Sequence, residues 1–183
     1  MLRTAGISLV GLVLLPGFAK GETINLGEYG PFEKIGFLAG TLDGSAWGFW
    51  AKKADGKEYD IINGKERGPY ERAWWPRFSS DGSVWGFLAE KPDDKWYLII
   101  NGKEWGPYED VVGPVFSSDG SAWGFWAKKP DGKEYIIING KEWGPYEDAW
   151  WPQFSLDGSV VLYAATKIKP SYYRIERIGV PTK

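Results

Sequence analysis

The fold of this chain is decided by a stretch of 38 residues, GPYEDVVGPVFSSDGSAWGFWAKKPDGKEYIIINGKEW, at positions 106–143. Short aliphatic and aromatic runs alternate in it with the turn dipeptides Asp119-Gly120, Asp131-Gly132 and Asn139-Gly140. Asp-Gly and Asn-Gly suit the positive φ angles of tight hairpin turns. The stretch therefore predicts four short antiparallel strands, VGPVFSS, SAWGFWA, YIII and KEWGPY, the last of which runs on into the following residues.

The same pattern occurs four times along the chain. Its Asp-Gly-Ser triplets recur 38 residues apart, at Asp43, Asp81, Asp119 and Asp157. The units span 30–67, 68–105, 106–143 and 144–181, and each begins with Gly-Pro and an aromatic residue. A fixed period with four strands in roughly 40 residues is typical of one blade of a β-propeller. We therefore expect an all-β protein, a β-propeller of four 38-residue blades that forms a single domain over residues 22–183.

The second predicted strand of each unit is apolar on both faces. In the first unit Trp47 and Phe49 alternate with Gly48 and Trp50. A sheet with one wet face would alternate apolar and polar residues, so both faces are expected to be covered by neighbouring blades. The glycine at this place recurs in the next two units, and a glycine inside a strand predicts close approach by a neighbour. We expect that neighbour to be a ring from the next blade.

The ends of the repeat suggest how a ring could close. TINLGEYGPF at 23–32 aligns with IINGKERGPY at 61–70, so the chain begins late in a unit. The last unit lacks the Asn-Gly-Lys-Glu hairpin and has Arg177-Ile178-Gly179-Val180 in its place. The N-terminal strand could therefore supply the missing edge of the last blade. The alternative is an eight-bladed ring shared by two chains, so a monomer and a dimer both remain open.

The N-terminus has the pattern of an export signal. Arg3 precedes an almost wholly apolar run from Ala5 to Phe18, and Gly17-Phe18-Ala19 offers small residues for cleavage after Ala19. The run is shorter than the roughly 20 residues that a spanning helix prefers, although an uncleaved anchor is the alternative. We expect residues 1–19 to be a signal peptide, the mature protein to be periplasmic or extracellular, and no membrane span to remain after cleavage.

Composition excludes several kinds of chemistry. The chain has no Cys and no His, so it contains no disulfide, no Ser–His–Asp triad, no Cys nucleophile and no His or Cys ligand for zinc or haem. The formal net charge is −2 and no basic patch interrupts the alternating Lys and Glu, which argues against a nucleic-acid partner. The Asp of each Asp-Gly pair is best explained by turn geometry. We expect no cofactor, no metal site and no catalytic residue.

The lines FSSDGS at 78–83 and 116–121 and FSLDGS at 154–159 resemble the TolB-like, WD-type β-propeller repeat, whose hallmark is Phe-Ser-Pro-Asp-Gly. The first unit departs from it, with GTLDGS at 40–45, and Ser80, Ser118 and Leu156 stand where the family has Pro. The resemblance implies the fold, and it implies a periplasmic or extracellular binding platform or the non-catalytic partner of an enzyme domain. It assigns no catalytic residue.

Two units out of four carry the sequence Ala-Trp-Trp-Pro, at 73–76 and 149–152. Residues 43–66 and 119–142 are identical at 22 of 24 positions, differing only at Ala54/Pro130 and Asp60/Ile136, so a 76-residue pair of units was duplicated. Adjacent residues on a strand point to opposite faces. We therefore expect one tryptophan of each pair to pack between blades and at most one to reach a channel mouth.

These tryptophans are the candidate ligand-binding residues, because Trp faces stack on sugars and cations and Trp is enriched at binding hot spots. Arg77 and Gln153 follow them at one repeat position and could add hydrogen bonds. The candidate site comprises Trp74, Trp75, Arg77, Trp150, Trp151 and Gln153. Packing of all four indoles in the core is the competing interpretation.

Three functions are compatible with these features. The first is a secreted, non-catalytic module that recognises a protein, peptide or glycan through one mouth of the propeller channel. The second is a glycoside hydrolase, which would need two carboxylates at a set separation; no unit offers an unrepeated acid pair among aromatic residues. The third is a purely structural protein of an envelope assembly. The absence of catalytic residue types favours the first.

Overall fold

The structure, a computed structural model, describes residues 26–74, 76–155, 158–169 and 172–180. Within these ranges the chain forms only antiparallel strands and turns. None of these residues belongs to a helix long and apolar enough to cross a membrane. The predicted signal peptide at 1–19 lies outside the described residues.

The strands form four sheets, one from each unit, which we number in chain order. Sheet one comprises β1 (Lys34–Gly40), β2 (Trp47–Lys52), β3 (Glu58–Ile62) and β4 (Lys65–Tyr70). Sheet two comprises β5 (Arg72–Ala73), β6 (Arg77–Phe78), β7 (Trp85–Glu90), β8 (Trp96–Ile100) and β9 (Lys103–Tyr108). Sheet three comprises β10 (Asp110–Phe116), β11 (Trp123–Lys128), β12 (Glu134–Ile138) and β13 (Lys141–Tyr146). Sheet four comprises β14 (Gln153–Phe154), β15 (Val160–Lys169) and β16 (Tyr172–Gly179).

The predicted succession of four strands per unit is confirmed in sheets one to three. Each of these sheets is a meander, with every strand hydrogen-bonded to the next, and β5 and β6 together make the first strand of sheet two. The Asn-Gly turns lie between the third and fourth strands, where Asn63, Asn101 and Asn139 adopt φ angles of 47°, 48° and 47°. Each fourth strand ends with Gly-Pro-Tyr, so the sheets begin a few residues later than the units defined from the sequence.

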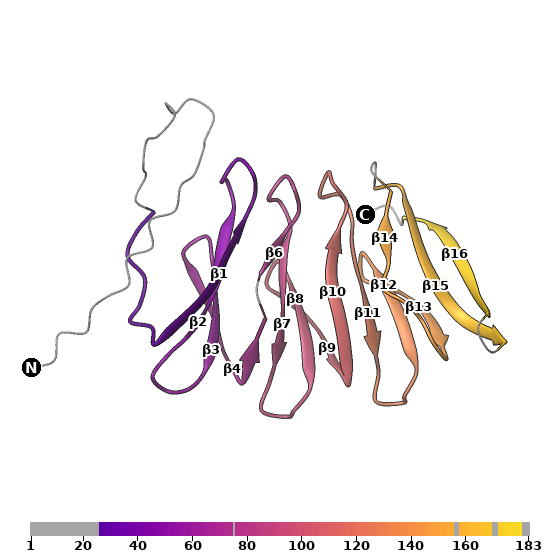
Figure 1. Cartoon of the computed structure of the whole chain (residues 1–183), viewed down its shortest axis with the longest axis horizontal. Coiled ribbons are helices and arrows are strands. Elements are labelled where there is room, and N and C mark those ends of the chain that lie inside the picture. Colours follow the sequence, from indigo (N-terminus) through magenta and orange to yellow (C-terminus); the bar gives the residue numbers. More distant parts are fainter. Residues whose placement is uncertain (1–25, 75, 156–157, 170–171, 181–183) are drawn as a thin grey trace, which may run out of the picture.

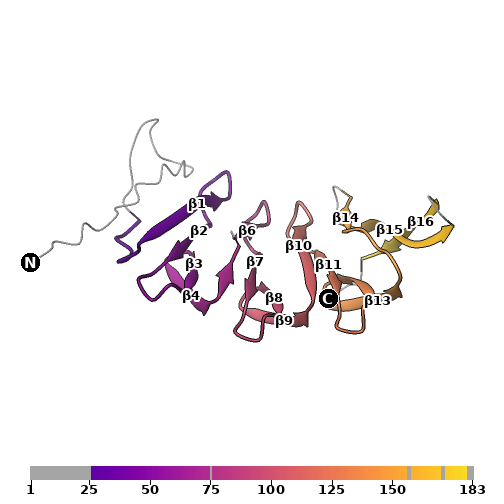
Figure 2. The ribbon, with the colours of Figure 1, turned by 60° about the horizontal axis from the view of Figure 1, so that its bottom comes forward.

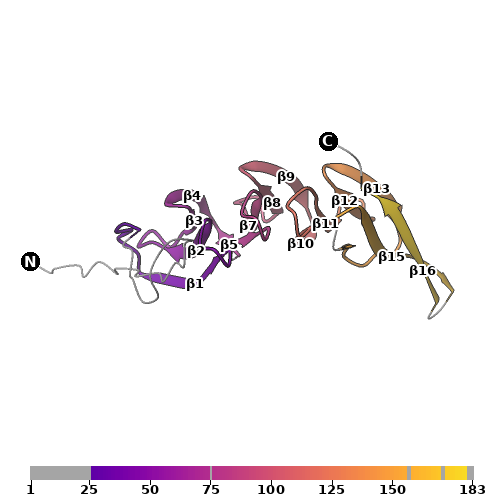
Figure 3. The ribbon, with the colours of Figure 1, turned by 90° about the horizontal axis from the view of Figure 1, so that it is seen from above.

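The four sheets stand side by side in an open row (Figure 1). Figures 2 and 3 place the first strands along one side of this row and the fourth strands β4, β9 and β13 along the other. Propeller blades have this arrangement, with the first strand innermost. No closed sheet occurs among the described strands. Sheets one and four lie at opposite ends of the row, so the four sheets do not close into a ring.

The N-terminal segment does not complete sheet four. Its described residues, 26–32, form no strand and lie against sheet one. The ring of Tyr29 lies 5.4 Å from that of Trp47, and the ring of Phe32 lies 6.0 Å from that of Phe49. The expectation of closure by this strand is therefore not met, because its aromatic side chains are buried against the nearer end of the row.

Neighbouring sheets pack on one another through a repeated aromatic contact. The tyrosine that ends a fourth strand meets, edge to face, the phenylalanine in the second strand of the next sheet: Tyr70 with Phe87 at 5.7 Å and Tyr108 with Phe125 at 5.8 Å. Phe32 and Phe49 make the same contact before sheet one. The hydrophobic core is therefore distributed over the interfaces between sheets, which confirms that both faces of these strands are covered.

The close approach predicted at the strand glycines is confirmed, and the neighbouring ring is a proline. A Cβ atom on Gly86 would lie 3.1 Å from Cγ of Pro114 in the next sheet and 2.6 Å from the carbonyl oxygen of Ile99. Gly48 and Gly124 meet Pro76 and Pro152 in the same way, with Cβ distances of 3.1 and 3.3 Å. The prolines of the first strands thus occupy the space that the glycines leave.

Candidate functional site

The Ala-Trp-Trp-Pro segments lie where the first strand of a sheet is interrupted. In sheet two, Ala73 pairs with Ala89 and Arg77 pairs with Gly86, so the first strand has one residue more than β7 over this span. The register of sheet three shifts at the same repeat position, between Val112 and Val115. One extra residue on one strand is a β-bulge, which turns side chains out of the regular alternation. Trp74 therefore lies at a bulge, where the regular alternation of side chains between two faces is broken.

For the pair in the last sheet, the expectation that one indole is buried is wrong. Trp150 and Trp151 are both exposed, at 53% and 49%, and their rings contact each other with centroids 5.9 Å apart. Neither residue belongs to a regular strand. In the last sheet, therefore, both indoles are available at the surface. For this pair the interpretation as core packing is wrong.

In sheet two only Trp74 can be placed, because Trp75 lies outside the described residues. Trp74 is 58% exposed, and its ring meets that of Trp96 edge-on at 5.7 Å. The guanidinium of Arg72 covers Trp96 at 5.1 Å and also pairs with Glu90. Trp74 thus makes an aromatic contact with Trp96, and more than half of its surface is exposed to solvent.

The alanine before each Trp pair takes part in a hydrogen-bond arrangement that also occurs in alternate units. Glu58 accepts hydrogen bonds from the indole of Trp50, at 3.0 Å, and from the backbone N–H of Ala73 in the next sheet, at 2.7 Å. Glu134 does the same with Trp126 at 3.0 Å and Ala149 at 2.6 Å. We call this arrangement the glutamate clasp. In unit two, Leu88 and Trp96 occupy the equivalent positions, so sheets two and three have no such clasp.

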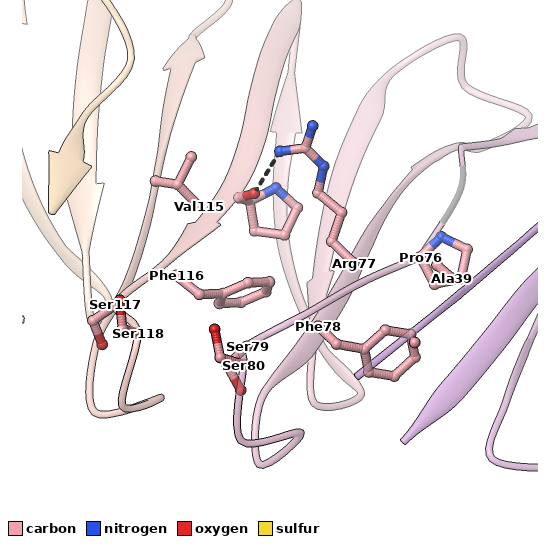
Figure 4. A pocket seen from close by; sticks show the side chains of 12 residues that line it. Ala39, Pro76, Arg77, Phe78, Ser79, Ser80, Val115, Phe116, Ser117 and Ser118 are labelled. Carbon is pink, nitrogen blue, oxygen red and sulfur yellow. Dashed lines mark hydrogen bonds between the residues drawn. The ribbon is translucent and has the colours of Figure 1, made fainter. Parts of the chain in front are cut away.

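A shallow hollow of about 400 Å³ crosses the first strands of sheets one, two and three (Figure 4). We call it the first-strand hollow. Its lining consists of Ala39, Gly40, Pro76, Arg77, Phe78, Ser79, Ser80, Pro114, Val115, Phe116, Ser117 and Ser118. Phe78 and Phe116 supply aromatic surface, and Ser80 and Ser118 are exposed hydroxyl groups.

The hollow includes one of the residues singled out from the sequence. Arg77 lines it and donates a hydrogen bond from Nη1 to the carbonyl oxygen of Pro114 in the next sheet, at 3.2 Å. Gln153 lies at the equivalent position of sheet four, is exposed, and does not line the hollow. The structure therefore brings Arg77 into the hollow and leaves Gln153 with Trp150 and Trp151 in the last sheet.

The serine end of the hollow is fixed by the Asp-Gly turns. Ser79 donates to Asp81 at 2.6 Å, and Ser117 donates to Asp119 at 2.7 Å. These hydroxyl bonds, with those from Ser121, lower the pKa of Asp119 to about 2, and the corresponding bonds lower the pKa of Asp81. The aspartates are thus ionised turn residues, as the sequence indicates. No cluster of acidic side chains suited to a metal ion occurs in the described ranges.

The hollow does not provide the groups needed for hydrolysis by paired carboxylates. None of its twelve lining residues is Asp or Glu. The acid with the most perturbed environment is Asp60, whose pKa is raised well above its usual value by burial and by the neighbouring charge of Glu58. Asp60 is fully enclosed between sheets one and two and does not line the hollow. The arrangement supports binding through stacking and hydrogen bonding.

Sequence reasoning did not identify the hollow itself. Phe78, Ser80, Val115, Phe116 and Ser118 were assigned to strands and turns only. The signal was present, because they occupy matching positions in neighbouring units. Their convergence depends on how the sheets stack, which the repeat pattern does not specify.

No protein-family model matches the chain, and no curated protein matches its sequence. Solved structures are similar in fold. The β-propeller domain of the Trilobed protease from Pyrococcus furiosus, described as having an open velcro topology, is 15% identical with a TM-score of 0.54; the match covers 84% of this chain and 59% of that one.

Two TolB structures are also similar, each at 15% identity. The putative TolB from Agrobacterium tumefaciens has a TM-score of 0.44, with 78% of this chain and 60% of that chain covered. TolB from Acinetobacter baumannii has a TM-score of 0.42, with 88% and 44% covered. The chain thus spans about half of the length of the structures it matches. The β-propeller fold inferred from the sequence is confirmed, because the chain consists of antiparallel sheets of short strands and resembles a solved β-propeller domain.

Proposed function

We propose that this protein is a non-catalytic binding module that recognises a protein, peptide or glycan along the first strands of its blades. The observation that carries this proposal is the exposure of Trp74, Trp150 and Trp151, which lie on the segments that lead into β6 and β14. Trp74 lies on the strand whose continuation, from Pro76 to Ser80, lines the first-strand hollow. One strand therefore presents a free aromatic surface and a wall of the hollow.

Further apolar side chains support this assignment. Leu38 and Val112 are exposed at or beside the equivalent bulges of sheets one and three, and Trp150 and Trp151 are exposed on the segment leading to β14. Exposed large apolar residues that gather along one element mark interaction sites, whereas single scattered ones need no explanation. The first-strand side of the row thus differs from the fourth-strand side, where lysines and glutamates form ion pairs.

A location outside the cytoplasm fits such a module. The apolar segment and the cleavage pattern at 1–19 support export to the periplasm or the extracellular space. Fractionation of cells that produce the full chain, followed by N-terminal sequencing, tests this. A mature N-terminus at Lys20 in the exported fraction is the expected result, and an intact N-terminus in the cytoplasmic fraction would contradict it.

The binding function is tested by probing peptide and glycan arrays with the purified protein and with the variants Trp74→Ala and Trp150→Ala/Trp151→Ala. Binding by the wild type and at least tenfold weaker binding by the variants is expected, because aromatic anchors dominate the energy of binding sites. Ile175→Ala is the matched control, since Ile175 is an exposed apolar residue of β16, away from the first strands.

Circular dichroism of each variant separates loss of binding from loss of folding. If folded Trp variants bind as well as the wild type, the indoles are not the recognition surface. If the wild type binds nothing on either array, the proposed function is wrong. A panel of chromogenic glycosides, on which no turnover is expected, tests the hydrolase alternative in the same preparation.

A further inference from the structure

The first-strand hollow carries an uneven distribution of charge. Of its twelve lining residues, Arg77 alone is charged. The serine end lies against the ionised aspartates of the Asp-Gly turns, Asp81 and Asp119, which accept hydrogen bonds from Ser79 and Ser117. An anionic group in the hollow is therefore attracted toward Arg77 and repelled from the turns.

Arg77 is positioned by the next sheet and retains most of its hydrogen-bonding capacity. Its Nη1 donates to the carbonyl oxygen of Pro114, which holds the guanidinium across the boundary between sheets two and three (Figure 4). A guanidinium has five N–H groups, and this bond uses one. No ion pair of Arg77 is found among the residues that the structure describes, whereas Arg72 on the same interrupted strand is paired with Glu90.

Arg77 also breaks the repeat. The equivalent residues are Ala39, Val115 and Gln153, so only unit two places a cation here. The first two of these residues also line the hollow, one on either side of sheet two. The cation thus stands in the middle of an otherwise uncharged surface. A structural role shared by all units would require the same residue type at this position in each of them. The cation at Arg77 therefore has a role that is specific to unit two.

From this geometry we propose that Arg77 anchors an acidic side chain of an extended peptide that lies across the first-strand hollow, with apolar neighbours of that side chain resting on Phe78, Val115 and Phe116. Arginine binds carboxylates through two parallel N–H bonds, which adds direction to the attraction. The hollow is open and crosses three strands, so a chain can pass through it without ending there. This inference rests on the proposed binding function and names its ligand.

The test uses an array of N-acetylated, C-amidated nonapeptides with apolar flanks and Asp, Glu, Asn, Gln or Lys at the centre, together with matched peptides that have a free C-terminal carboxylate. The array is probed with the full chain. The wild type is expected to bind the Asp or Glu peptides at least tenfold more tightly than the Asn or Gln peptides. Arg77→Gln is expected to remove that preference, and Arg77→Glu to favour peptides with a central Lys. Lys103→Gln, which removes an exposed cation from the fourth strand β9, is expected to change nothing.

The outcomes separate this inference from the proposed function. Peptide binding with no preference for acidic centres, or a preference that survives Arg77→Gln, overturns the inference and leaves the function standing. Binding to glycans and to no peptide also overturns the inference and leaves the proposed function standing. Binding only to matched peptides with a free C-terminal carboxylate overturns the choice of an acidic side chain. Absence of binding to peptides and glycans alike overturns both.

Discussion

The interface between sheets one and two differs from that between sheets two and three, although the two sheet pairs share the same backbone plan. The first interface encloses Asp60 and the cross-strand neighbour Arg67. At the second, the same positions hold Leu98 and Trp105. Nine buried hydrophobic residues form one cluster between sheets two and three. One repeat fold therefore tolerates a polar interface and an apolar one.

The buried polar groups of the first interface lack the hydrogen-bond partners that buried polar groups usually have. Both carboxyl oxygens of Asp60 and the Nε of Arg67 are buried without a hydrogen-bond partner. Arg67 instead covers the ring of Trp85 at 5.2 Å, as Trp105 covers Trp123 at 5.1 Å. A buried polar group without a partner is destabilising. Arg67 therefore packs on an indole ring as Trp105 does, whereas Asp60 does not replace the apolar packing of Leu98.

The two interfaces also differ in how the backbone is joined. The glutamate clasp links sheet one to sheet two and sheet three to sheet four. Between sheets two and three, the N–H of Val111 bonds to the side chain of Asp110 instead. The glutamate clasp thus alternates along the row with the same 76-residue period as the sequence.

The largest effect is expected when an aspartate is placed in the apolar interface between sheets two and three. Leu98→Asp is expected to destabilise the protein by about 3–5 kcal/mol, because it buries an unpaired carboxyl beside Trp105. Urea unfolding followed by tryptophan fluorescence measures this. The double variant Leu98→Asp/Trp105→Arg, which recreates the Asp60 and Arg67 pair, is expected to recover part of the loss. A Leu98→Asp variant as stable as the wild type would show that the second interface is not a tight apolar core.

The converse change is expected to stabilise. Asp60→Leu/Arg67→Trp copies unit two into unit one and is expected to gain about 1–4 kcal/mol at pH 7, since well-packed apolar residues remove the cost of buried polar atoms that lack a hydrogen-bond partner. The pH dependence of the stability provides a second test of the buried Asp60. Burial raises the pKa of Asp60 above its ordinary value of 3.8, so the folded state holds this proton more tightly than the unfolded state.

The stability contributed by protonated Asp60 is full below its unfolded pKa and is lost as the pH rises through the raised folded value. Unfolding measured from about pH 5 to pH 8 should therefore show a decline in the wild type that the double variant lacks. The turn aspartates, with pKa values near 2 in Asp43 and Asp119, stay ionised over this range and do not obscure the effect. Parallel pH profiles for the two proteins would show that burial does not raise the pKa of Asp60.

Removing the glutamate clasp tests the second difference between the interfaces, the hydrogen bond from a glutamate of one sheet to the backbone of the next. Glu134→Ala leaves the indole N–H of Trp126 and the backbone N–H of Ala149 without their acceptor, and a loss of about 1–3 kcal/mol is expected. Hydrogen exchange at Ala149 should become faster. Glu134→Gln is the matched control, because its amide oxygen can still accept, and it should lose less. Equal losses would indicate that charge, and not the hydrogen-bond acceptor, matters.

The smallest effect is expected where the units are alike. Lys53–Glu66, Lys91–Glu104 and Lys129–Glu142 join at 2.7, 2.6 and 2.7 Å on the fourth-strand side. Surface pairs contribute about 0–1 kcal/mol. Lys53→Gln and Lys91→Gln should therefore each change stability by less than about 1 kcal/mol, by the same amount, and less at high salt. A larger loss in one of them would mean that the sheets differ at their edges as well.

Much of the fold could be predicted, and part of the site could not. The Asp-Gly and Asn-Gly turns locate the strands because their backbone conformations are local properties of a few residues. The exposure of both Trp150 and Trp151 differs from the prediction, because alternation between two faces holds only for residues in a regular strand. A bulge arises from the pairing of two strands, so the residues of one strand do not reveal it. Arg77 was identified, but the aromatic wall beside it was not.

The repeat, the four short strands of a blade, the covered faces of the second strands and the tight approach at Gly48, Gly86 and Gly124 can all be inferred from the sequence. Each of these follows from local turn chemistry or from which residue types can be buried. Three features become visible only in the folded chain: the described sheets stand in an open row, Glu58 and Glu134 join alternate sheets, and Arg77 meets Pro114 beside a hollow. These features depend on contacts between residues that are distant in sequence, and such contacts form only when neighbouring sheets stack.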